Sequence, residues 1–141
     1  KNNIGPCHSI FLRLSEIKKI GFFDLSLKSC EDWDFWIRAA KLGFEICSIP
    51  KSLVAYRYIS GSMSKNPIQM YEALCKVSTR ASQADSRIPL AVSLNQDFDF
   101  DLEDQFKQNF IKCLGVSLFQ GKLEESITWY KKETQKFQWF I

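Results

Sequence analysis

The sequence predicts an α+β fold, with a small strand-and-helix unit at residues 1–65 followed by a helical extension at residues 66–141. Two observations lead to this prediction. In the first unit, a short apolar run at residues 44–50 ends in proline and follows a segment with helical spacing, which is typical of a strand after a helix. Beyond residue 66, apolar side chains recur at helical spacing, interrupted by proline and glycine.

Composition narrows the class of protein. A chain of 141 residues suits a single domain with its own core. Hydrophobic residues make up 45% and charged residues 25%, which is not the composition of a disordered chain. The net charge of +3 is small and no basic cluster carries interleaved aromatics, so we expect no nucleic-acid partner. No stretch approaches the ~18 apolar residues of a membrane-spanning helix.

The cysteines favour a reducing compartment. Their number is odd and no two have Cys-x-x-Cys spacing, which argues against zinc ligation and against a disulfide framework. We expect reduced thiols, mostly buried as small hydrophobes, and therefore a cytoplasmic location and no metal site. Membrane association of a full-length protein stays open. The five cysteines are Cys7, Cys30, Cys47, Cys75 and Cys113.

Two helices are expected in the first unit. A short one begins near Glu16 and is stopped by Gly21, and a second begins at residue 31 and is stopped by Gly43. The second helix carries Trp33 and Trp36 on an apolar stripe at helical spacing. A place in the core is the favoured interpretation of both tryptophans, and a platform for stacking a sugar is the alternative for Trp33.

A pair of carboxylates, Glu31 and Asp32, begins the second helix. A helix start presents free backbone N–H groups and the positive end of the helix dipole. A carboxylate placed there stays ionised at neutral pH and can accept a proton from a substrate hydroxyl. Acidic residues also favour the first turn of any helix, so the pair alone does not establish a catalytic role.

Five short patterns follow one another between about residues 8 and 64, and together they carry a resemblance. In chain order they are Gly21-Phe22-Phe23-Asp24, Glu31-Asp32 with Arg38, the glycine-to-proline segment 43–50, Tyr56-Arg57, and Ser62 with Ser64. This order resembles the acceptor-side half of family 2 glycosyltransferases, which have the GT-A fold. The resemblance ends at about residue 66.

The resemblance implies a function and assigns residues to it. Asp32 would be the general base, with Glu31 as its neighbour, and would deprotonate the acceptor hydroxyl as that hydroxyl attacks the anomeric carbon with inversion. Trp33, Arg57 and Ser62 would bind substrate, the last two near the diphosphate. The implied partners are a nucleotide-sugar donor and a carbohydrate or lipid-linked acceptor, as in polysaccharide biosynthesis. A full-length enzyme of this kind can use Mg or Mn.

The chain departs from the family pattern at two positions, and it lacks the donor-binding half of the family's catalytic domain. Phe22 stands in place of a second glycine, and Ile59 stands where many relatives have a histidine near the metal, so no metal contact is expected here. The family binds its donor through an N-terminal half with an Asp-x-Asp motif, and only 30 residues precede Glu31. We therefore expect a C-terminal piece of a longer enzyme, inactive alone, on which the missing half packs.

The extension begins with a clear helix signal and contains an acidic segment. Asn66 and Pro67 are typical of an N-cap and first turn, and this helix should end before Ser86.

The aspartates between residues 97 and 101 do not fit a calcium loop, because the sixth position of such a loop, counted from Asp97, is Leu102 rather than glycine. We expect an acidic approach to a helix N-terminus.

A helical hairpin is predicted at about residues 102–136, with its turn at Gly121. Residues 114–130 resemble a single tetratricopeptide repeat, in which Gly115 would allow close contact between the helices. The apolar stripes that should face each other are Leu102, Phe106, Phe110, Cys113, Leu114 and Ser117, and then Leu123, Ile127, Tyr130 and Thr134. The alternative function is therefore a helical protein-interaction module without catalytic activity, in which the acidic helix is structural.

Overall fold

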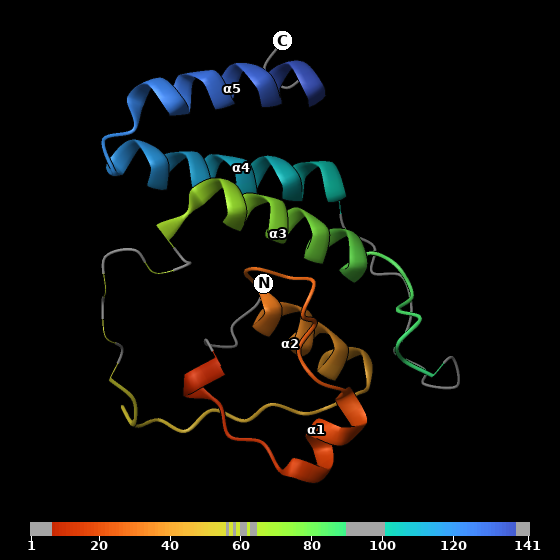
Figure 1. Cartoon of the computed structure of the whole chain (residues 1–141). Coiled ribbons are helices and arrows are strands. Elements are labelled where there is room, and N and C mark those ends of the chain that lie inside the picture. Colours follow the sequence, from red (N-terminus) through yellow and green to blue (C-terminus); the bar gives the residue numbers. More distant parts are fainter. Residues whose placement is uncertain are drawn as a thin grey trace.

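The computed structural model describes residues 7–55, 57, 59, 62, 65–89 and 101–137. In this part of the chain the regular structure is helical throughout, and no strand is formed (Figure 1). The elements are the 3-10 helix η1 (Cys7–Ser9) and the α-helices α1 (Leu14–Ile20), α2 (Glu31–Lys41), α3 (Pro67–Ala81), α4 (Leu102–Phe119) and α5 (Leu123–Phe137).

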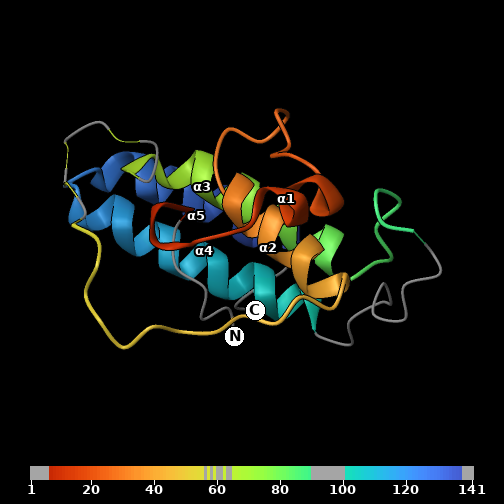
Figure 2. The ribbon, with the colours of Figure 1, turned by 90° about the horizontal axis from the view of Figure 1, so that it is seen from below.

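The predicted α+β fold, with a partial GT-A unit at residues 1–65, is therefore wrong. Residues 44–50, expected as a strand, follow α2 as an extended segment that pairs with no other strand among the described residues. An extended segment forms a stable strand only when a neighbouring strand pairs with its backbone N–H and C=O groups. The segment instead runs along the periphery of the molecule (Figures 1 and 2), and its Ile46 and Ile49 are exposed.

The helix boundaries in the first half of the chain agree with the sequence signals. Helix α1 ends at Gly21, whose φ of 85° is a conformation that side-chain-bearing residues rarely adopt. Helix α2 begins at Glu31 and ends just before Gly43, which has a φ of 79°. Helix α3 begins as predicted, because the Asn66 side chain accepts a hydrogen bond from the backbone N–H of Gln69 at 3.1 Å.

The hairpin of α4 and α5 is confirmed, with Gly121 (φ 77°) in the turn between them. Asp101 caps α4 by accepting a hydrogen bond from the backbone N–H of Asp104 at 2.9 Å. The acidic approach to a helix start is thus confirmed at Asp101, whereas residues 97–100 lie outside the described residues.

The larger core lies among α3, α4 and α5, which run side by side in Figure 1. Its centre is a trio of aromatic rings, one from each helix: Tyr71, Phe110 and Trp129. Their centroids are 5.0–5.6 Å apart and the rings meet edge to face, a favourable geometry for aromatic pairs. Of these three residues, Phe110 lies on the apolar stripes predicted for the hairpin, whereas Trp129 does not.

A smaller core joins α1 to α2 on the other side of α3 (Figures 1 and 2). Phe35 and Trp36 are its largest side chains and pack edge to face at 4.9 Å. The core interpretation of the tryptophans holds for Trp36. Trp33, in contrast, is 37% exposed.

The predicted apolar stripe of α5 is wrong in register. Leu123, Ile127 and Tyr130 are 40–59% exposed, whereas Ser126, Trp129 and Glu133 are buried. Burying the large indole decides the rotation of the helix, because it removes the most apolar surface from water. Each of the two polar residues buried with it forms a hydrogen bond, Ser126 with the Ser117 hydroxyl and Glu133 with the Tyr71 hydroxyl.

The predicted role of Gly115 is also wrong. This glycine is exposed, and a Cβ atom built on it would have no neighbour within 4 Å. The close polar contact between the two helices lies elsewhere, where the Ser126 hydroxyl donates to the Ser117 hydroxyl at 2.8 Å. A small residue at position 115 therefore does not bring α4 and α5 together.

All five cysteines are free thiols. Cys30 and Cys113 are buried and Cys75 is half-buried, as expected, whereas Cys7 and Cys47 are exposed. None of the helices in the described ranges has both the length and the apolar character needed to cross a membrane.

Candidate functional site

The predicted catalytic pair lies at the N-terminal turn of α2. Glu31 and Asp32 are both partly exposed, and the backbone N–H of Trp33 donates to Asp32 Oδ1 at 2.8 Å. Neither residue of the pair forms an ion pair with any other described residue.

A strained residue stands directly before the pair. Cys30 has a φ of 59°, and it is the one non-glycine residue in the described ranges with a positive φ. Such a conformation costs about 1–3 kcal/mol and often occurs at functional sites. Burial, followed by the charges of Asp32 and Glu31, raises the pKa of the Cys30 thiol to about 12, so this cysteine is not poised as a nucleophile.

Helix α3 holds the segment that leads into α2. Gln69 Nε2 donates at 2.8 Å to both the Lys28 carbonyl and the Ser29 hydroxyl, and the sulfur atoms of Cys30 and Met70 lie 3.2 Å apart. These contacts fix the backbone from which the carboxylate pair projects. They join residues 40 or 41 positions apart, and no local sequence pattern marks Gln69 for this role.

A third carboxylate, Asp34, has a different environment from the pair two residues before it. Asp34 is 2% exposed and lies among three arginines. It accepts hydrogen bonds from Arg38 Nε at 3.1 Å, from Arg80 Nη1 at 2.9 Å, and from Arg87 Nη1 and Nη2 at 3.0 and 2.9 Å. Its charge is thus fully engaged in an ion-pair network, and its role is structural.

The network extends to two further aspartates. Asp24 lies 2.7 Å from Arg80 and 3.4 Å from Arg87, and Asp85 Oδ2 lies 2.6 Å from Arg87 Nη2. Hydrogen bonding from Ser26, together with Arg80, holds the pKa of Asp24 well below its ordinary value. Burial would raise the pKa of Asp85, but the hydrogen bonds and charge of Arg87 outweigh it and lower that pKa.

Arg38 connects this network to the turn between α1 and α2. Its guanidinium donates to the carbonyl of Ile20 and, at 2.8 Å, to the carbonyl of Phe22. Gly21 lies between these two residues, and a Cβ atom on it would meet Arg38 Nη1 at 3.2 Å. The glycine turn and the arginine of the sequence pattern therefore act together as one structural unit.

Arg57 and Ser62, the remaining predicted site residues, make no direct polar contact with the carboxylate pair. Arg57 is exposed and Ser62 is half-buried, and no hydrogen bond or ion pair joins either of them to Glu31 or Asp32. Tyr56 and Ser64 lie outside the described residues.

Sequence reasoning did not identify the arginine network. The spacing of Asp34 and Arg38 at i and i+4 is a visible signal for an ion pair on one helix. Arg80 and Arg87 reach Asp34 across 46 and 53 residues, which no local pattern reveals.

The described residues do not fit a resident metal ion. In the described part of the chain, no three His, Cys, Asp or Glu side chains are grouped so that they could hold one. The aspartates of the network face arginines instead.

Comparisons of the chain with protein-family models, with curated proteins and with solved structures found no match.

Proposed function

We propose that the start of α2 supplies the acceptor side of a glycosyltransferase, with Asp32 as the general base and Glu31 as its neighbour. The observation that supports this is the contrast among three carboxylates within four residues. Asp34 is buried and bound by arginines, whereas Glu31 and Asp32 are partly exposed and form no ion pair within the described residues. A cap or a packing role alone does not require two accessible carboxylates beside a strained backbone.

The proposed reaction needs one proton acceptor at this position. Asp32 takes the proton of the acceptor hydroxyl while the hydroxyl oxygen forms a bond to the anomeric carbon of the donor sugar. The bond from that carbon to the nucleoside diphosphate breaks, and the diphosphate leaves with the electron pair. Attack from the face opposite the leaving group inverts the anomeric configuration. No step is assigned to a metal, because the described residues do not form a metal site.

The substrates follow from the same proposal. The donor is a nucleotide-activated sugar and the acceptor is a carbohydrate or lipid-linked hydroxyl, as in polysaccharide biosynthesis in the cytoplasm. Trp33 is partly exposed beside Asp32, which suits a ring that stacks on a sugar. Arg57 and Ser62 remain the proposed contacts to the diphosphate.

The proposal is tested by incubating the full-length protein with a panel of nucleotide sugars and acceptors. Release of nucleoside diphosphate that depends on the acceptor supports it, and proton NMR of the product determines the anomeric configuration. A product with retained configuration, or no transfer with any donor of the panel, contradicts the proposal.

A second candidate, the helical interaction module, is favoured by the all-helical structure of the described residues. Several large apolar side chains of the hairpin are exposed, which is common on binding surfaces. They include Ile111, Leu118, Phe119, Leu123 and Ile127. Acceptor-dependent sugar transfer that is lost in an Asp32 variant would decide against this candidate as the whole function.

A further inference from the structure

We propose that a pocket between α3 and α5 binds an alkylammonium group, the chemistry found in a lysine side chain or a free polyamine. This inference does not depend on the proposed sugar transfer. The pocket has a volume of about 590 Å³, within the usual range for ligand sites. Its lining residues are Ile68, Tyr71, Glu72, Glu124, Glu125, Thr128, Trp129, Lys132 and Glu133.

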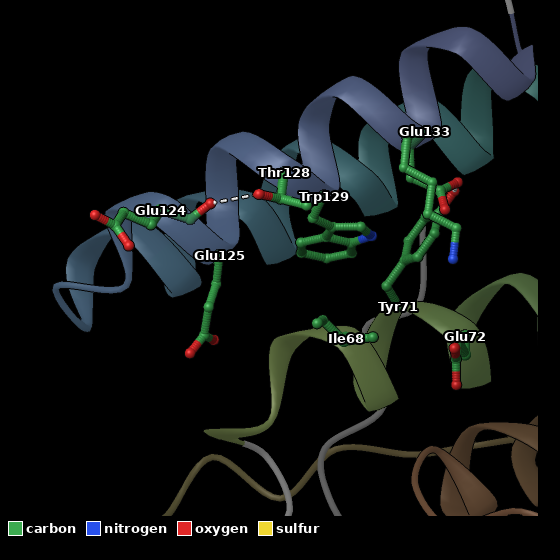
Figure 3. A pocket seen from close by; sticks show the side chains of 9 residues that line it. Ile68, Tyr71, Glu72, Glu124, Glu125, Thr128, Trp129 and Glu133 are labelled. Atoms are coloured by element: carbon green, nitrogen blue, oxygen red, sulfur yellow. Dashed lines mark hydrogen bonds between the residues drawn. The ribbon is translucent and has the colours of Figure 1, made fainter.

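The inner part of the pocket is aromatic and apolar. Trp129 projects from α5 toward α3, and Ile68 and Tyr71 project from α3 toward α5 (Figure 3). The rings of Tyr71 and Trp129 lie 5.5 Å apart at 69° to each other. An ammonium is attracted to the face of an aromatic ring, and its alkyl stem packs on an apolar wall.

Glu133 is the residue that points to a cationic ligand. It lines the pocket but is only 6% exposed, and its Oε2 accepts a hydrogen bond from the Tyr71 hydroxyl at 3.1 Å. The described residues supply no donor to its other oxygen and no cation within ion-pair distance. A buried carboxylate without a cation is unfavourable, and a ligand ammonium would supply the missing charge and donors.

The charges at the pocket mouth favour the same ligand. Glu72, Glu124 and Glu125 are exposed, so together with Glu133 four carboxylates surround the pocket, and one of them, Glu125, lies 3.9 Å from the ammonium of Lys122. The single lysine of the lining, Lys132, is exposed and forms no ion pair with any described residue. A concave surface of one dominant sign concentrates ions of the opposite sign.

The test is an NMR titration of the full chain with n-hexylammonium chloride at neutral pH and constant ionic strength. The indole N–H resonance of Trp129 should shift in a saturable manner. The neutral analogue 1-hexanol fills the same volume without the charge and should bind at least roughly tenfold more weakly. Spermidine and a peptide with one central lysine are then compared, to distinguish a free polyamine from a protein side chain.

Matched variants assign the binding to the pocket. Glu133→Gln keeps the shape and can still accept from Tyr71, and it should weaken hexylammonium binding roughly tenfold. Glu103→Gln removes the same charge from an exposed position on α4 outside the pocket and should have little effect. If Glu133→Gln does not fold, Glu125→Gln at the mouth should show a smaller weakening. Equal binding of hexanol and hexylammonium, or no shift at Trp129, overturns the proposal.

Discussion

Arg87 donates to both oxygens of Asp34, at 3.0 and 2.9 Å, across 53 residues of sequence. Hydrogen bonds of this kind between a guanidinium and a carboxylate are strong and geometrically specific. The pair ties the segment after α3 to the helix that presents Glu31 and Asp32. The first turn of α2 therefore carries two kinds of carboxylate. Asp34 holds the helix in place, whereas Glu31 and Asp32 are accessible.

Replacing Asp34 by Asn should destabilise the fold by about 3–5 kcal/mol, because it leaves the surrounding arginines without their shared charge partner. Denaturant unfolding measures this loss. Asp32→Asn is the matched control, since asparagine can still accept the hydrogen bond from the Trp33 N–H. Its cost should stay below about 1 kcal/mol. Similar losses for the two variants would show that the carboxylates do not have separate roles.

Asp24 should make the fold sensitive to acid. Its pKa is lowered in the folded protein from an ordinary value of 3.8. At a pH between the folded and the unfolded pKa of Asp24, the unfolded chain binds a proton that the folded protein does not. The stability that Asp24 contributes is therefore complete above pH 3.8 and is lost as the pH falls toward the folded pKa. The stability difference between wild type and Asp24→Asn should therefore shrink below that pH. A difference that stays constant from neutral to acidic pH contradicts the assignment.

Gly21→Ala should cost about 1–3 kcal/mol. Gly21 has φ 85° and ψ 172°, a region that is essentially restricted to glycine, and the new methyl group would also press on Arg38. Thermal unfolding provides the measurement. A melting temperature equal to that of wild type would mean that the turn between α1 and α2 can relax without loss.

Gly115→Ala should have the opposite effect. This glycine lies in the interior of α4, and an added Cβ meets nothing within 4 Å. Alanine is favoured over glycine inside a helix by about 0.8–1 kcal/mol, which corresponds to a rise in melting temperature of about 2–4 °C. A lower melting temperature would instead support the close helix contact that the sequence suggested.

Local signals in the sequence predicted the helices well. Asn66 and Pro67 marked the start of α3, Gly21 and Gly43 marked two helix ends, and Gly121 marked the hairpin turn. Each of these signals works within a few residues, because caps and positive φ angles are local properties. The carboxylate pair was likewise placed correctly at the first turn of α2.

Features that depend on distant partners could not be predicted in this way. The segment at residues 44–50 has the composition of a strand, but a strand exists only with a neighbour to pair with. The rotation of α5 is set by where the Trp129 indole finds space beside Tyr71 and Phe110. The partners of Asp34 come from segments 46 and 53 residues away, beyond the reach of any periodicity.

The central claim is that Asp32 is a proton acceptor in sugar transfer, and turnover of Asp32→Asn in the full-length protein tests it most directly. The variant keeps the shape and the hydrogen bond from Trp33 but removes the base, so kcat should fall by roughly 10²–10⁴-fold while donor binding and melting temperature stay near wild type. Glu31→Gln should do less harm. If Asp32→Asn transfers sugar at the wild-type rate, the pair is only a helix cap and the proposed function of this site is wrong.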